Sequence, residues 1–279
     1  MFRSLALSGG GVRGILHVGG LAAIEKRMGN LTFPDGVYGC SIGAVVATAV
    51  AFNLTAEQIK NMVLLDFDLS FIVPPLRLSS IQGILDRKGA FPMDNFETTL
   101  LTSFANQGID LRGKRIKDTP QKLFIGASNL TTRRPVFFSG NIPILEALKC
   151  SCCVPFVFEP QVLFGNVYLD GGVYIPRMNG FVPDETLIFH ISYTPACVTP
   201  EYLTTCSVSD FMKELYVGKE YRGNMENTMW FRENSVHILQ DVTLDDKERL
   251  WQDGRSQATS FFAKRFLEEP EQPVSSGAL

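Results

Sequence analysis

The sequence predicts an α/β protein with three layers, α/β/α, around a mostly parallel central sheet. The first observation is that short apolar runs typical of strands alternate with longer runs of helical spacing over the first fifty residues. The second is that a glycine-containing turn joins strand to helix in both of the first two units. Strand–helix–strand–helix order favours a parallel sheet, because parallel strands need a crossover between them.

The elements are expected in this order. The N-terminal half contains a strand at Phe2–Leu7, a helix at Ile15–Met28, a strand at Gly36–Tyr38, a helix from Ile42 to about Asn53, and a helix at Ala56–Leu65. Thr55 is the expected N-cap of the last of these helices, with Gln58 at the capping-box position. The segment Asp66–Leu85 has two prolines and many apolar residues but little periodicity, so we interpret it as a loop that acts as a lid or touches a membrane.

The second half alternates less regularly. It is expected to contain helices at Met93–Ala105, Pro143–Cys150 and Asp245–Leu267, and strands at Lys122–Ala127, Pro135–Phe138, Leu187–Ser192 and Val236–Gln240. No linker divides the chain, which predicts a single domain over residues 1–269, and the polar residues 270–279 are expected to form a disordered tail.

Composition excludes several classes of function. The chain has 279 residues with a net charge of −3, and no run of Lys or Arg exceeds two residues, so nucleic-acid binding has no electrostatic support. Six cysteines are too few for a disulfide scaffold, and no apolar run reaches the length of a membrane span. We therefore expect a cytoplasmic protein with reduced thiols. The spacing of Cys150, Cys152 and Cys153 favours packed thiols over a zinc site, so no metal is expected.

The first glycine motif has two interpretations. Gly9, Gly11 and Gly14 form G-x-G-x-x-G between a strand and a helix, which is the context of a dinucleotide-binding loop. That function also needs an acidic residue at the end of the second strand, whereas Asp35 lies before that strand. The alternative is a backbone-built anion site.

The second glycine motif is G-x-S-x-G, formed by Gly39, Ser41 and Gly43 between a strand and a helix. A serine on such a turn projects its hydroxyl from the sheet edge as a nucleophile, and the alternative is an ordinary tight turn. If the two strands are neighbours, the N–H groups of the first glycine loop lie beside Ser41, where the oxyanion of an acyl-transfer intermediate needs donors.

A serine nucleophile needs a base. Asp170 ends an apolar strand and is followed by Gly171 and Gly172; an apolar setting raises the basicity of its carboxylate, although Asp-Gly-Gly is also a common turn. His17, His190 and His237 are the three histidines, and chain order also permits a Ser41–Asp170–His237 triad.

Three blocks in this order resemble the patatin-like phospholipases, a family of lipid acyl hydrolases. Gly9-Gly10-Gly11-Val12-Arg13-Gly14 is similar to the family's glycine-rich oxyanion motif, Gly39-Cys40-Ser41-Ile42-Gly43 to its nucleophile elbow, and Asp170-Gly171-Gly172 to its proton-acceptor motif. The resemblance covers about residues 4–176. The chain departs from the family at Cys40, where a small residue, often Thr, is expected, and at Ile175, where many members carry Asn.

The resemblance implies a patatin-like variant of the α/β-hydrolase fold and a Ser41–Asp170 dyad without histidine. It implies hydrolysis of fatty-acyl esters, phospholipids above all, with no cofactor and no metal in the chemical step. The oxyanion hole is assigned to the backbone of Gly10, Gly11 and Val12, and Arg13 either adds charge near a phosphate or orients the loop. Transient contact with a membrane surface follows from such a substrate; the oligomeric state stays open. The alternatives are a catalytically degenerate lipid-binding module and, less favoured, a dinucleotide-dependent oxidoreductase.

An acyl chain also needs a dry groove. The apolar candidates for its lining are Phe67, Phe71, Ile72, Val73, Phe156 and Phe158, with ordinary core packing as the alternative.

Overall fold

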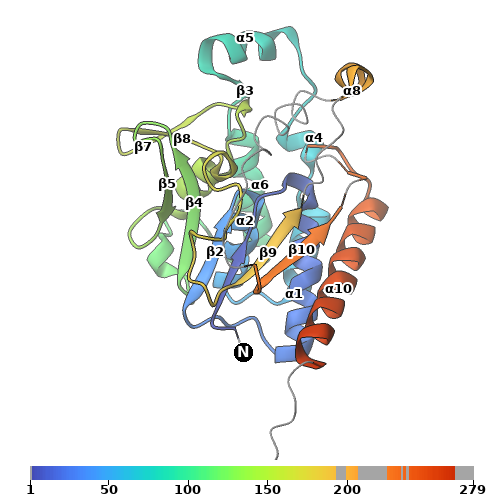
Figure 1. Cartoon of the computed structure of the whole chain (residues 1–279). Helices are drawn as coiled ribbons and strands as arrows, with labels where there is room; N and C mark the ends of the chain where they lie inside the picture. The colour runs from blue at the N-terminus through green and yellow to red at the C-terminus, as the bar shows by residue number, and fades with distance from the viewer. Residues whose placement is uncertain (1, 193–198, 207–224, 234, 237–238, 268–279) are drawn as a thin grey trace, which may run out of the picture.

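An eight-stranded, mostly parallel sheet forms the centre of the molecule (Figure 1). The computed structural model describes residues 2–192, 199–206, 225–233, 235–236 and 239–267. The strand order is β10-β9-β1-β2-β4-β8-β7, and β5 also pairs with β4. The strands are β1 (Ser4–Leu7), β2 (Gly36–Cys40), β4 (Leu123–Asn129), β5 (Arg134–Phe138), β7 (Gln161–Leu163), β8 (Asn166–Leu169), β9 (Leu187–Ser192) and β10 (Thr228–Arg232). A separate two-stranded sheet joins β3 (Gly89–Phe91) to β6 (Phe156–Phe158).

The parallel half of the sheet brings the first two strand–helix turns together. Strands β10, β9, β1, β2 and β4 pair in parallel, whereas β5, β7 and β8 join antiparallel. Leu7 at the end of β1 is in register with Gly39 of β2. The loops that follow these two strands therefore leave the same edge of the sheet side by side.

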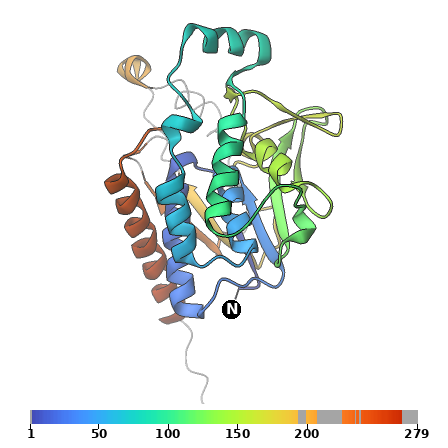
Figure 2. The ribbon, with the colours of Figure 1, turned by 180° about the vertical axis from the view of Figure 1, so that it is seen from behind.

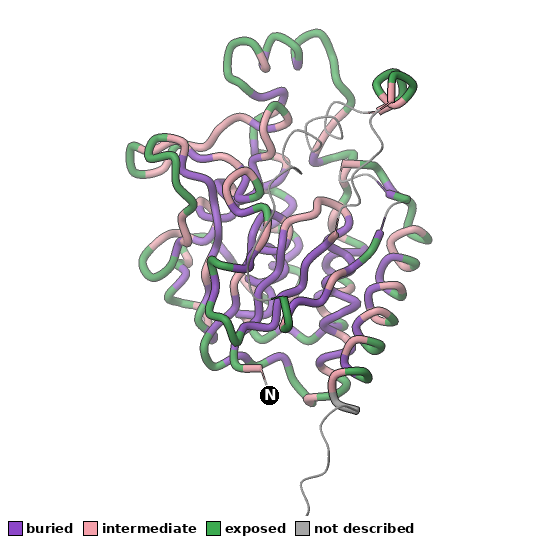
Figure 3. Tube along the Cα trace, viewed as in Figure 1, coloured by how far each residue is buried: buried purple, intermediate pink, exposed green. Residues whose placement is uncertain are grey.

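Helices cover one face of the sheet, which Figure 2 shows from behind. They include α1 (Ile15–Met28), α2 (Ile42–Ala51), α3 (Ala56–Asn61, continued by a π turn at Met62–Asp66), α6 (Asp94–Asn106), α7 (Ile144–Cys152) and α10 (Leu244–Leu267). Helix α2 reads IGAVVATAVA and is buried from Gly43 to Ala51, as expected for a helix that is apolar all round. Figure 3 shows this buried region running through the sheet into α1 and α2.

The opposite face is covered by the chain that follows β8. A short 3-10 helix at Gly171–Val173 opens this segment, and Ile175, Met178 and Val182 pack on Ala6 and Ile188 of the sheet. Here the outer layer is irregular chain and a 3-10 turn. The predicted α/β class with a mostly parallel central sheet is confirmed.

Two sequence expectations are wrong. Within the expected strand Val236–Gln240, residues 237 and 238 lie outside the described part of the chain, and residues 236, 239 and 240 are not in a strand; the edge strand that the structure shows is β10, which lies just before and was not predicted. The segment Asp66–Leu85 is not a loop, because α4 (Leu69–Ile72) and α5 (Leu78–Arg87) occupy most of it. The short helix α8 (Pro200–Thr205) was also not predicted.

The tail at 270–279 lies outside the described residues. Among the helices that the structure describes, none combines the length and the apolar character needed to span a bilayer.

Candidate active site

Ser41 occupies a strained turn between β2 and α2. Its φ and ψ are 55° and −133°, so its backbone lies in the left-handed half of conformational space that a side chain disfavours. The flanking glycines make this turn possible. A Cβ on Gly39 would lie 2.4 Å from Ala44 Cα, and a Cβ on Gly43 would lie 2.3 Å from the carbonyl oxygen of Leu7. The G-x-S-x-G spacing is thus required by close packing of strand, turn and helix.

The hydroxyl of Ser41 donates a hydrogen bond of 2.6 Å to Oδ2 of Asp170. Asp170 directly follows β8 and caps the 3-10 helix, with its Oδ1 accepting the backbone N–H of Gly172 at 2.8 Å. Both Ser41 and Asp170 are buried. Burial raises the pKa of Asp170 to about 6, against the opposing effect of the hydrogen bonds from Ser41 and Gly172.

Two further serines, which sequence reasoning missed, hold this pair in place. Ser151 of α7 accepts the backbone N–H of Ser41 at 2.9 Å and donates to the carbonyl of Gly126 at 2.6 Å. Ser128 of β4 donates to the carbonyl of Asp170 at 2.9 Å and accepts the N–H of Tyr174. Ser151 lies in the CSCC segment, whose cysteines we interpreted as packed thiols, and nothing in the sequence around Ser128 points to its role.

The glycine-rich loop lies against Ser41. A Cβ on Gly9 would be 3.1 Å from Cβ and 3.8 Å from Oγ of Ser41. After Gly10, a 3-10 turn at Gly11–Gly14 runs directly into α1, and Gly11 has a φ of 57°. The first N–H groups of a helix have no partner within it, so those at the start of this turn are available to an anion.

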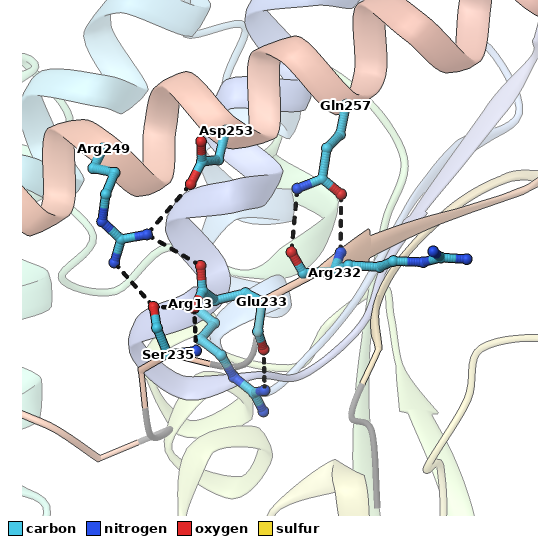
Figure 4. Close-up of polar contacts among 7 residues, drawn as sticks. All are labelled: Arg13, Arg232, Glu233, Ser235, Arg249, Asp253 and Gln257. Atoms are coloured by element: carbon cyan, nitrogen blue, oxygen red, sulfur yellow. Dashed lines mark hydrogen bonds and ion pairs between the residues drawn. The ribbon is translucent and has the colours of Figure 1, made fainter.

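Arg13 fixes the same loop from the other side. Its side chain is buried and donates to the carbonyl of Glu233, just beyond β10, at 3.3 Å (Figure 4). The carboxylate of Glu233 pairs with Arg249 of α10, which also pairs with Asp253. This network favours the interpretation of Arg13 as a residue that orients the loop.

The described histidines belong to the core. His17 is fully buried, its Nε2 lies 2.9 Å from the carbonyl oxygen of Ser8, and burial lowers its pKa to about 4. His190 is buried beside Trp230, and burial lowers its pKa to about 3. Both rings are therefore neutral at pH 7. His237 lies outside the described residues.

The cysteines near the site are buried thiols. Cys40 is fully buried, and burial, together with the negative charge of Asp170, raises the pKa of its thiol well above the ordinary value. Cys150, Cys152 and Cys153 are free and lie in the main hydrophobic core, as the packed-thiol interpretation predicted.

The apolar groove candidates are mostly core residues. Ile72 and Phe158 are buried, and Phe67 and Val73 pack partly buried against the core. Only Phe71 and Phe156 are about half exposed.

Ile175, at the position that departs from the family pattern, is buried in the second hydrophobic cluster, which also contains Cys40.

Comparison with known proteins identifies the relationship. The family model for patatin-like phospholipase matches residues 5–179, which contain all three motifs. An uncharacterised Bacillus subtilis protein, YqhO, is 28% identical over 194 residues, covering 62% of this chain and 64% of YqhO. A probable lipid hydrolase, 463L, of Invertebrate iridescent virus 6 is 26% identical over 197 residues, covering 68% of this chain and 64% of that protein. The chain therefore spans less than two thirds of the length of these curated relatives.

The fold has a counterpart among solved structures. The crystal structure of VipD from Legionella pneumophila superposes with a TM-score of 0.58, covering 94% of this chain and 67% of VipD at 17% sequence identity. At that identity the likeness concerns the fold.

Proposed function

Because the chain belongs to the patatin-like phospholipase family, we propose that it hydrolyses fatty-acyl ester bonds of phospholipids or related lipids, with Ser41 as nucleophile and Asp170 as base. The observation that carries this proposal is the 2.6 Å hydrogen bond between Ser41 Oγ and Asp170 Oδ2 beside the glycine-rich loop. A relative described as a probable lipid hydrolase supports the same class of substrate.

In the proposed first step, Ser41 Oγ attacks the ester carbonyl carbon while its proton passes to Asp170 Oδ2. Burial raises the pKa of Asp170 to about 6. The carboxyl is therefore a stronger base than an ordinary aspartate, yet it is still mostly ionised at pH 7. A hydroxyl already bonded to that oxygen needs no further movement to lose its proton.

The negative charge that develops on the carbonyl oxygen is proposed to be held by the backbone N–H groups of Gly10, Gly11 and Val12. These groups begin the turn that leads into α1, where the helix dipole favours negative charge.

Collapse of the tetrahedral intermediate breaks the bond to the lipid alcohol, which takes the proton from Asp170. The acyl group then remains on Ser41. Asp170 next accepts a proton from a water molecule that attacks the acyl-enzyme, and the fatty acid leaves as Ser41 Oγ recovers its proton. No step of this scheme needs a metal or a cofactor.

Residues 1–269 form the proposed catalytic unit. Because its substrates assemble into membranes, we propose that it works in transient, peripheral contact with a lipid surface.

A covalent probe and a lipid panel test the proposal. A fluorophosphonate should label the wild-type protein at Ser41, and wild-type protein should release free fatty acid from a panel of phospholipids. Ser41→Ala should do neither while keeping its fold by circular dichroism. Phospholipid binding by a folded wild-type protein without labelling or release would instead identify a degenerate lipid-binding module.

A further inference from the structure

Helix α5 exposes three large apolar residues on one side. Leu78, Ile81 and Leu85 follow a spacing of three and four residues, which places them on one side of the helix. Their exposed fractions are 83%, 53% and 68%. We call these three residues the outward face of α5.

The inward side of α5 is formed by Ser80 and Gly83, with the half-buried Ile84 beside them. Ser80 is buried, and Gly83 lies so close to β3 that a Cβ would be 2.8 Å from the carbonyl oxygen of Gly89. Arg87, on the same side, pairs with Glu159. Packing against the protein thus relies on the small residues Ser80 and Gly83. The larger side chains of Leu78, Ile81 and Leu85 stay in water, where an ordinary surface helix would bury them.

This helix stands at the end of the molecule that carries the candidate active site. Figures 1 and 2 both show α5 beyond the carboxyl ends of the central strands, the end from which the glycine-rich loop and Ser41 emerge. Leu76, in the chain that enters α5, is also 68% exposed. An apolar surface at this end of the molecule is well placed to contact the lipid surface that contains the proposed substrate.

Charge around the helix points to the chemistry of its partner. Residues 76–88 contain Arg77, Arg87 and Lys88 against a single acidic residue, Asp86, in a chain whose overall net charge is −3. Arg77 and Lys88 are exposed and lie at the two ends of α5. Basic residues that flank an exposed apolar helix face match the anionic headgroups and acyl chains of a phospholipid surface.

A second copy of the chain fits this face less well. A stable dimer buries about 800 Å² per partner, far more than one side of a ten-residue helix offers.

We propose that the outward face of α5 docks on an anionic phospholipid surface, with Leu78, Ile81 and Leu85 entering the headgroup region and Arg77 and Lys88 contacting anionic headgroups. The assignment rests on the proposed lipid hydrolase function and names the surface through which that site meets its substrate.

Vesicle sedimentation tests the docking directly. Ser41→Ala protein, which leaves the lipid intact, is mixed with vesicles of phosphatidylcholine, with and without phosphatidylglycerol. Adding Leu78→Ser and Leu85→Ser should lower partitioning on the order of tenfold or more, because each leucine loses its transfer from water. The matched control, Leu78→Met with Leu85→Met, should bind as strongly as the parent. Arg77→Gln with Lys88→Gln should weaken binding about fivefold for each cation removed, and only to vesicles that contain phosphatidylglycerol.

The same variants with Ser41 intact separate docking from catalysis. The variant with Leu78→Ser and Leu85→Ser, called the serine variant, should retain wild-type kcat/KM on a soluble p-nitrophenyl ester and lose activity on vesicle phospholipid. Equal vesicle binding by the serine and methionine variants would overturn the docking proposal, even if the soluble ester is hydrolysed. Binding that depends on Leu78 and Leu85 without any ester hydrolysis would uphold docking and overturn the proposed function. A dimer seen by sedimentation velocity and lost in the serine variant would assign this face to a second copy instead.

Discussion

The hydroxyl of Ser151 accepts the backbone N–H of Ser41 at 2.9 Å and donates to the carbonyl of Gly126 at 2.6 Å. One side chain of α7 thus ties the turn after β2 to the neighbouring strand β4. Ser41 has a φ of 55°, a conformation that persists only where surrounding contacts hold it. The position of the Ser41 hydroxyl therefore depends on a residue that lies 110 positions further along the chain.

Ser151→Ala should reduce both stability and turnover. It leaves the buried N–H of Ser41 without its partner, a loss of about 1–3 kcal/mol. We expect a lower Tm in calorimetry and a lower kcat on a soluble ester. Ser103→Ala is the matched control, because Ser103 is a buried serine whose hydroxyl has no hydrogen-bond partner within the described part of the chain. That variant should keep its Tm and kcat, and an equal response of the two variants would contradict the role of Ser151.

Asp170→Asn should stabilise the protein at neutral pH. The pKa of Asp170 is about 6 in the folded chain and near 3.8 in an ordinary carboxyl, so the native state favours the protonated form. The stability that the carboxyl contributes is therefore fully present below pH 3.8 and is lost as pH rises through 6. Asparagine resembles the protonated acid in carrying no charge. We expect Asp170→Asn to have a free energy of unfolding higher than that of the wild type by on the order of 1–3 kcal/mol at pH 7.5, and this difference should vanish as pH falls towards 4. Urea unfolding of both proteins across this pH range measures the difference in their free energies of unfolding. A difference that is independent of pH would refute the raised pKa of Asp170.

How much of the fold could be predicted depends on where its determinants lie. The helix Ile15–Met28 and the strand Leu187–Ser192 were predicted with the bounds that the structure shows, because a glycine turn and a continuous apolar run define them locally. The edge strand Thr228–Arg232 was missed, and Val236–Gln240 was predicted as the strand in this region. Thr228–Arg232 forms a strand because it pairs with β9, whose residues lie forty positions earlier in the chain.

In the candidate active site, too, the residues marked by local motifs could be predicted, and those that act through distant contacts could not. Ser41, Asp170 and the glycine loop could be placed on one sheet edge from motifs and strand order, and the structure brings them together. The supporting serines could not be found, because Ser128 and Ser151 act through backbone groups distant in sequence. Helix α5 was misjudged for a different reason. Leu78, Ile81 and Leu85 have helical spacing, but this short run was read together with the two prolines and the irregular residues before it, so the whole segment was interpreted as a loop.

His237→Ala should retain most of the activity. The carboxylate oxygens of Asp170 accept hydrogen bonds from Ser41 and from the backbone of Gly172, so the serine already has its base in the proposed dyad. Turnover of a soluble ester by this variant, compared with Ser41→Ala, measures the contribution of the histidine. A loss as large as that of Ser41→Ala would assign the base to a Ser41–Asp170–His237 triad.

Ser41→Ala and Asp170→Asn should each abolish ester hydrolysis, and the double variant should be no worse than either. The two side chains share one proton and act as a unit, so their effects are not additive. The wild-type rate should also rise with pH through about 6, because only the ionised carboxylate can accept the serine proton. Single-turnover assays of the purified variants measure these rates. Full turnover by Ser41→Ala, or strictly additive losses, would contradict the shared mechanism.

Gly11→Val should lower turnover while the fold persists. Gly11 has a φ of 57°, which a β-branched side chain strongly resists, so the loop must change its path and move the N–H groups at the start of α1. Loss of one oxyanion donor lowers kcat on the order of 100- to 1000-fold. Gly113→Val is the matched control, since Gly113 also has a positive φ, of 73°, and a Cβ there meets nothing within 4 Å. Both variants carry the backbone strain, but only Gly11 belongs to the glycine-rich loop that packs against Ser41 through Gly9, so only Gly11→Val should lose kcat on a short-chain p-nitrophenyl ester. A folded Gly11→Val protein with wild-type kcat would mean that the glycines serve the turn and not the reaction.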